Sequence, residues 1–189
     1  MTVAVHVQLD PGRVYRTSER RQWSANPTRL SARLEQAGQI RRLGHGLLYA
    51  PYRGRFGEVP PSEEALLSTF LEGTPYLITG PSRWNALGLG STALFAHPLV
   101  YNTQRTGYFL LGGRGFTLRR VGFPVPAPAE WFVVDLLRNA ASVGMDPQEL
   151  VMHLRASVDR FDPKVLTAMA ARFGRRAEQA WVRLALKEA

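Results

Sequence analysis

The chain of 189 residues is 45% hydrophobic, which is enough to bury the core of one domain or of two small ones. It contains no cysteine, so disulfides and thiolate metal sites are excluded and a reducing compartment is favoured. No apolar run approaches the roughly 18 residues that a membrane span requires, and residues 1–10 lack the pattern of a signal peptide. We therefore expect a cytoplasmic protein that does not cross a membrane.

The formal net charge of +9 is concentrated in one segment of the chain. Residues 13–55 contain ten arginines and two glutamates, whereas the rest of the chain is nearly neutral. Arginine is the cation best suited to bidentate contacts with phosphate and with guanine. The concentration of arginine therefore predicts a nucleic-acid partner for this segment, and a generally basic, solvated surface is the alternative.

The segment 26–49 has the pattern of a short helix followed by a β-hairpin. Asn26 can accept a backbone hydrogen bond as the N-cap, and Pro27 suits the first helical position, where no donor is needed. Apolar residues then recur at positions i, i+4 and i+7 and form one narrow stripe with polar residues opposite. This stripe consists of Leu30, Leu34 and Ala37. A helix that buries one stripe and presents a polar outer face is typical of a DNA-recognition helix.

A basic hairpin follows this helix. Gly38 favours a left-handed stop at the helix end. Two short runs, 39–43 and 47–50, are then separated by Gly44-His45-Gly46, which has the glycines of a tight turn. The helix and the hairpin together predict the recognition half of a winged helix-turn-helix.

The residues before the recognition helix are harder to match to this fold. Residues 2–9 alternate loosely and predict a short strand, and residues 14–16 are expected to continue as extended chain. Thr17-Ser18 is expected to cap a short helix over residues 19–23. A DNA-binding domain over residues 1–55 follows from this. Most winged helices carry a further helix before this pair, and here either that helix is missing or the strand-like segment replaces it.

The chain changes character after the hairpin. Residues 51–61 are rich in proline and lack periodicity, which predicts a linker that can follow a DNA backbone. The second domain is expected over residues 56–189. Its expected helices cover 61–71, 81–88 and 131–142 and begin again at 147, 163 and 175, and its expected strands cover 75–79, 99–102, 108–111 and 116–121. The fold class is therefore α+β, an N-terminal winged helix-turn-helix followed by a small sheet domain with a C-terminal helical tail.

Several motifs resemble the AbiEi-type antitoxins of bacterial type IV toxin–antitoxin systems. The hairpin 41–49 (RRLGHGLLY) resembles their wing, and the likeness continues through 55–62 (RFGEVPPS) and 77–90 (LITGPSRWNALGLG). It also includes the strand 100–102 and the pair Arg119-Arg120. The order of wing, linker motif and ITGPSRWNALGLG segment is more specific than the short wing motif alone.

The resemblance implies a transcriptional autorepressor and antitoxin. In such families the N-terminal winged helix binds inverted repeats in double-stranded DNA upstream of its own operon. The C-terminal domain counteracts a cognate nucleotidyltransferase-like toxin. Two alternatives stay open: a toxin-neutralising interaction protein with secondary DNA binding, and a stand-alone winged-helix regulator.

The candidate DNA contacts lie on three elements. They are Thr28, Arg29, Ser31, Arg33 and Gln36 on the recognition helix, Arg41, Arg42 and His45 on the hairpin, and Arg53 and Arg55 in the linker. Arginine can read guanine and glutamine can read adenine in the major groove, whereas the hairpin side chains would contact phosphates or the minor groove. The two linker arginines are candidates for contacts with the DNA backbone. A solvated helix face and strand-edge charges that prevent edge pairing are the alternatives. Arg119 and Arg120 are expected to be surface charge or a partner contact.

No sequence motif predicts an enzyme, a metal site or a cofactor. The four histidines are widely separated and lack the spacing of metal ligands. Residues 88–92 (GLGST) lack the lysine of a phosphate-binding loop. We therefore expect a protein that acts by binding rather than by catalysis.

Overall fold

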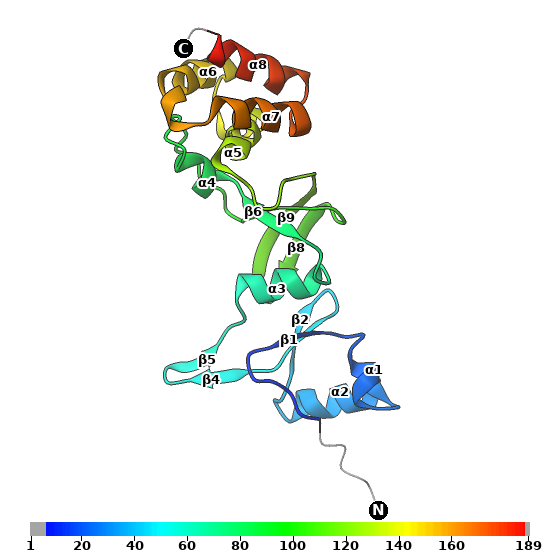
Figure 1. Cartoon of the computed structure of the whole chain (residues 1–189). Coiled ribbons are helices and arrows are strands. Elements are labelled where there is room, and N and C mark those ends of the chain that lie inside the picture. Colours follow the sequence, from blue (N-terminus) through cyan, green and yellow to red (C-terminus); the bar gives the residue numbers. More distant parts are fainter. Residues whose placement is uncertain (1–6, 188–189) are drawn as a thin grey trace, which may run out of the picture. The chain divides into compact units, whose positions relative to one another are not determined.

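In a computed structural model, which describes residues 7–187, the chain forms eight α-helices and three small β-sheets (Figure 1). This confirms the expected mixture of α and β structure. The chain forms two compact units, one of residues up to Tyr76 together with Tyr108–Phe116, and one of Leu77–Gly107 together with the residues from Thr117 onward. The expected division into domains of residues 1–55 and 56–189 concerns independent folding and stays a prediction.

The first unit is built on a three-stranded antiparallel sheet. Its order is β1 (Val14–Arg16), β3 (Leu47–Tyr49) and β2 (Arg41–Gly44), with Val14 opposite Tyr49 in the register. Two helices lie between β1 and β2 in the sequence, α1 (Arg20–Trp23) and α2 (Pro27–Gln36). The extended chain predicted over 14–16 is therefore confirmed as a strand.

Helix α2 starts and stops as its sequence predicts. The side chain of Asn26 accepts a hydrogen bond from the backbone N–H of Arg29 at 3.2 Å, and Gly38 adopts a φ of 68° just beyond the helix. Leu30 and Leu34 are buried, and each fully buried leucine stabilises the fold by about 1.5–3 kcal/mol. They pack in one cluster with Tyr15, Ile40, Leu48 and Ala50. Ala37, expected in the same stripe, is exposed because the helix has already ended at that position.

Two expectations for the N-terminal residues need correction. The expected strand over 2–9 lies largely outside the described residues, and residues 7–9 form no strand. Helix α1 begins at Arg20 without a side-chain cap from Thr17 or Ser18. The reason is that the N–H of Thr17 donates to the carbonyl of Gly46 at 2.7 Å, so Thr17 extends the edge of the sheet and the helix starts later.

The predicted linker at 51–61 is wrong, because this segment forms a second hairpin. Strands β4 (Tyr52–Gly54) and β5 (Gly57–Val59) pair as a separate two-stranded sheet. Gly57 supplies a φ of 116° after the two-residue turn, a value that L side chains rarely adopt. Each strand has only three residues, which is too short for a periodic signal in the sequence.

The predicted helix over 61–71 is confirmed as α3 (Glu63–Phe70). The side chain of Ser62 caps it by accepting from the N–H of Ala65 at 3.1 Å. Glu63 and Glu64 lie in its first turn, where the helix dipole favours acidic side chains.

The third sheet has the strand order β6-β7-β9-β8. Its strands are β6 (Tyr76–Thr79), β7 (Leu99–Asn102), β8 (Gly107–Leu111) and β9 (Arg114–Arg120). Strands β7 and β9 run parallel, with Leu99 opposite Thr117. All four strands were expected, within two residues at their ends. The expected helix over 81–88 is shorter, α4 (Pro81–Asn85).

The helices of the second unit enclose its core. They are α5 (Ala129–Arg138), α6 (Pro147–Ala156), α7 (Pro163–Phe173) and α8 (Arg176–Leu186), with short 3-10 turns at Ala140–Val143 and Val158–Arg160. The expected caps at Asp146 and Asp162 are confirmed, because each side chain accepts a backbone hydrogen bond from the first helical turn. The helix expected over 131–142 ends earlier, at Arg138, and continues as a 3-10 turn.

One carboxyl group lies in the middle of this core. Asp135 on α5 is 1% exposed, and its two oxygens accept four hydrogen bonds from side chains on three other elements and on α5's own C-terminal end. The donors are Thr79 Oγ1 at 2.6 Å, Trp84 Nε1 at 3.0 Å, Tyr101 OH at 2.8 Å and Asn139 Nδ2 at 3.1 Å. Burial raises the pKa of Asp135, and the hydrogen bonds from Thr79, Tyr101 and Trp84 oppose this rise.

Removal of one donor should destabilise the second unit. Tyr101→Phe leaves one carboxylate oxygen of Asp135 with a single donor, and we expect a loss of about 1–3 kcal/mol in the free energy of unfolding. The native pKa of Asp135 is raised by burial, so its contribution to stability is complete at low pH and is lost as the pH rises from about 3.9, the ordinary pKa of aspartate in the unfolded chain, to the native pKa. The Tyr101 hydroxyl stabilises the ionised form, so the difference between variant and wild type should increase as the pH rises through the raised native pKa of Asp135.

Urea denaturation of wild type and variant between pH 4 and pH 8 measures this effect. Tyr52→Phe is the control, because Tyr52 is 49% exposed and its hydroxyl has no hydrogen bond within the described residues. Equal stability of Tyr101→Phe and wild type across this range would contradict the prediction.

Candidate nucleic-acid interface

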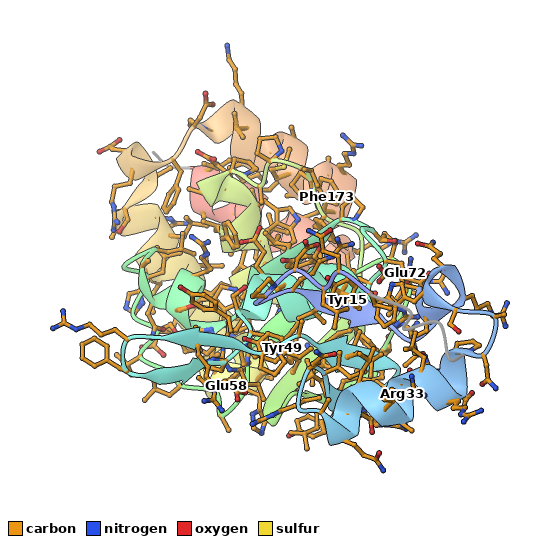
Figure 2. The ribbon with its side chains drawn as sticks, turned by 90° about the horizontal axis from the view of Figure 1, so that it is seen from below. Tyr15, Arg33, Tyr49, Glu58, Glu72 and Phe173 are labelled. Carbon is orange, nitrogen blue, oxygen red and sulfur yellow. The ribbon has the colours of Figure 1, made fainter. Side chains whose placement is uncertain are left out.

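Helix α2 presents a polar ridge opposite its buried side. Leu30, Ser31 and Leu34 are buried, and at 100° per residue the opposite face carries Arg29, Arg33 and Gln36. These three side chains are exposed and share one face because they are spaced at i, i+4 and i+7. Thr28 is exposed beside them in the first turn. Figure 2 shows Arg33 on α2.

Arg29 does not stabilise the helix, whereas Arg33 lies in its last turn, where the helix dipole favours a cation. Arg29 and Arg33 are like charges at i and i+4, an arrangement that costs about 0.2–0.5 kcal/mol. Arg29 also lies in the first turn, where the helix dipole disfavours a cation and where α2 has no acidic residue. Neither arginine has an ion-pair partner in the part of the chain that the structure describes. Two guanidinium groups are thus held on one face and open to an anion.

Ser31 does not lie on the predicted DNA-contacting surface of α2. It is fully buried, and its hydroxyl donates to the carbonyl of Pro27 at 2.9 Å and accepts from Arg20 Nη1 at 3.1 Å. Arg20 also donates to the carbonyl of Thr17 at 2.8 Å, so the serine helps to hold α1 against α2. The sequence placed Ser31 on the polar side because serine is polar, whereas its angle around the helix lies beside Leu34.

The arginines of the β2–β3 hairpin are exposed but paired. Arg42 Nε lies 2.7 Å from Glu35 on α2, and Arg41 Nη2 lies 2.8 Å from Glu58 on β5. Ion pairs this exposed contribute little to stability, about 0–1 kcal/mol, so a phosphate can replace either acid at small cost. Arg41 and Arg42 remain candidate phosphate contacts.

His45, at the turn of the same hairpin, is packed against other residues of the first unit. The centre of its ring lies 5.9 Å from that of Phe70 and 5.4 Å from that of Phe109, both in edge-to-face geometry. The turn is also fixed by a hydrogen bond from the N–H of Gly112 to the carbonyl of Leu43 at 2.8 Å. His45 is nevertheless exposed, so it stays a candidate DNA contact whose ring is oriented by Phe70 and Phe109.

Arg53 and Arg55 lie on the β4–β5 hairpin, and both are exposed. Arg53 pairs in register with Glu58, and the guanidinium of Arg55 lies 5.7 Å from the centre of the Phe56 ring. Sequence reasoning missed Phe56, which is 97% exposed, because the segment was expected to be a linker. The two residues Arg55-Phe56 between Gly54 and Gly57 were the signal that could have identified the turn.

Arg119 and Arg120, the arginine pair of the second unit, differ in their surroundings. Arg119 Nη1 donates to Asn139 Oδ1 at 2.9 Å and so joins the hydrogen bonds around Asp135. Arg120 is exposed and stays a candidate for surface charge or a partner contact.

Two further findings concern residues 7–187. None of the helices there has the length and apolar character that a bilayer crossing requires. In the same residues no three acidic or histidine side chains gather in a way that could hold a metal ion.

Comparison with known proteins shows a likeness in fold. No protein-family model matches the sequence, and no curated protein matches it. The crystal structure of the RV2827C protein from Mycobacterium tuberculosis is similar, with a TM-score of 0.55 over 93% of this chain and 71% of that chain. The two sequences are 13% identical, so the likeness concerns the fold alone.

The burial of Ser31 leads to a testable distinction between structure and binding. Ser31→Ala removes a hydroxyl between α1 and α2, and we expect a loss of about 1 kcal/mol in the free energy of unfolding. DNA affinity, measured where the variant is fully folded, should stay unchanged. Ser68→Ala on α3 is the control, since Ser68 is an exposed helical serine of the same unit. If Ser31→Ala weakened DNA binding and left stability unchanged, the prediction would be wrong and Ser31 would belong to the binding surface.

Proposed function

We propose that this protein is a sequence-specific DNA-binding repressor of its own promoter. In this proposal α1, α2 and the β2–β3 hairpin act as a winged helix-turn-helix, with α2 as the recognition helix. The observation that carries the proposal is the ridge of Arg29, Arg33 and Gln36, whose two guanidinium groups lack acidic partners among the described residues.

The chemistry of this ridge suits the major groove. An α-helix fits the width of that groove, where arginine binds the O6 and N7 atoms of guanine and glutamine binds the N6 and N7 atoms of adenine. Asn26 orders the first turn of α2, and the free N–H groups at a helix N-terminus favour a phosphate. The excess of arginine over residues 13–55 adds sequence-independent attraction to the DNA backbone.

We further propose the antitoxin role that the resemblance to AbiEi-type proteins implies. The second unit would then counteract a nucleotidyltransferase-like toxin encoded beside this gene. If the protein counteracts no such toxin, the alternative is a stand-alone regulator. The two roles use different surfaces in this proposal, so they can be separated by substitution on α2.

Binding to the upstream region tests the repressor proposal. We expect a gel shift on this duplex whose affinity falls steeply with salt, by about 0.9 log units per log unit of salt for each neutralised phosphate. Arg29→Ala should lower the preference for one base pair by about 1–3 kcal/mol. Arg183→Ala, an exposed arginine on α8, is the matched control and should bind as wild type does. Absence of a shift at low salt would refute the proposal.

Co-expression tests the antitoxin proposal. The full chain with Arg29→Ala and Arg33→Ala should lose promoter binding yet still restore growth of cells that express the neighbouring nucleotidyltransferase-like gene. Growth is compared with that of cells carrying the wild-type protein or an empty vector. Failure of the wild-type protein to restore growth would favour the stand-alone regulator.

A further inference from the structure

The β4–β5 hairpin is separate from the other two sheets. It forms a two-stranded sheet by itself, and a hairpin of this kind is marginally stable without further support. Its register pairs Tyr52 with Val59, Arg53 with Glu58 and Gly54 with Gly57, so Arg55 and Phe56 form the turn. The turn is thus the outer end of the hairpin, and its two side chains are a cation and an aromatic ring.

The base of the hairpin is anchored to the three-stranded sheet. The hydroxyl of Tyr49 donates to the carbonyl of Val59 and accepts from the N–H of Tyr52 at 3.4 Å. Glu58 is paired with Arg41 on β2. These contacts couple both strands of the hairpin to residues of the sheet that follows α2. Figure 2 shows Tyr49 in the sheet and Glu58 on the hairpin.

The turn of the hairpin exposes its aromatic ring. Phe56 is 97% exposed, and at the base of the hairpin Tyr52 and Val59 are 49% and 43% exposed. A ring with nearly all of its surface in water gains almost no burial from folding, so Phe56 contributes little to the stability of the hairpin. Large apolar side chains held at a protruding end are typical of a contact surface.

The charges around this end favour DNA as the partner. Glu58 is neutralised by Arg41, which leaves Arg53 and Arg55 as the net charges of the hairpin. Arg53 has no ion-pair partner in the described part of the chain, and Arg55 is held near the Phe56 ring. Arginine attracted to the minor groove, next to an apolar wedge that separates two base pairs, is a recurring arrangement in proteins that bend DNA.

The β2–β3 hairpin is less able to fill this role. Its turn residue His45 lies against Phe70 and Phe109, and its Leu43 carbonyl accepts from Gly112. His45 itself is exposed, but these contacts tie its turn to other parts of the first unit. Among the described residues, the Phe56 ring of the β4–β5 turn has no ring contact with another element.

We propose that the β4–β5 hairpin is a DNA-bending arm, whose turn enters the minor groove and places Phe56 against a base step. Arg53 contacts the phosphate backbone, and Arg55 enters the groove beside the ring. The arm acts next to the site read by α2. This inference rests on the proposed DNA binding and adds to it a second groove, a wedge residue and a change in DNA shape.

The test measures affinity and bending on the same duplex. The upstream region, labelled at its two ends for energy transfer, is titrated with wild type, Phe56→Ala, Phe56→Trp and the control Leu94→Ala. Leu94 is 89% exposed in the second unit and matches Phe56 in exposure. We expect Phe56→Ala to bind about 10-fold more weakly and to bend the duplex less, whereas Phe56→Trp keeps both properties because it keeps a ring.

The outcomes separate this inference from the proposed function. The control is thermal denaturation. If Phe56→Ala unfolds at the same midpoint temperature as wild type, the substitution leaves the fold intact. If wild type binds the duplex and Phe56→Ala binds and bends it equally, the arm is refuted while the repressor proposal stands. If no protein binds, both are refuted. If Phe56→Ala keeps DNA binding and bending but no longer opposes the toxin, the turn is a protein contact and the arm is again refuted.

Discussion

The carboxyl group of Asp135 is the constraint on which the second unit depends. It lies on α5, and its hydrogen-bond donors come from β6, α4, β7 and the residue after α5, so one buried group orients four parts of the chain. A buried carboxylate that lost these donors would bear the cost of desolvation without compensation. The ITGPSRWNALGLG motif supplies two of these donors, Thr79 and Trp84, so this motif contributes to the structural centre of the second unit.

Polar contacts between side chains also connect the elements of the first unit. Ser31 and Arg20 join α1 to α2, and Glu35 and Glu58 hold Arg42 and Arg41. Both glutamates therefore pair with arginines of the β2–β3 hairpin. The arginines on the outer face of α2 have no ion-pair partner within the described residues. This distribution, more than the net charge, supports the proposal that α2 binds DNA. In that proposal the paired arginines of the β2–β3 hairpin are secondary contacts.

Much of the fold could be predicted, because local rules decide helix ends and strand lengths. Asn26, Asp146 and Asp162 followed by proline start helices, and glycines end them or turn hairpins. The candidate site was predicted less completely. Arg29, Arg33 and Gln36 follow from helical spacing, whereas the burial of Ser31, the packing of His45 and the exposure of Phe56 depend on residues distant in sequence.

The sequence by itself determined the position of α2, its polar face and the concentration of arginine around it, since helical periodicity and composition are local properties. Only the tertiary structure decided which arginines are paired, because Glu35 and Glu58 approach Arg42 and Arg41 through the pairing of strands and the packing of α2. It likewise decided that the segment after the first hairpin is a second hairpin with Phe56 at its turn. Three-residue strands acquire their structure from cross-strand hydrogen bonds and from anchors such as Tyr49, which no local pattern encodes.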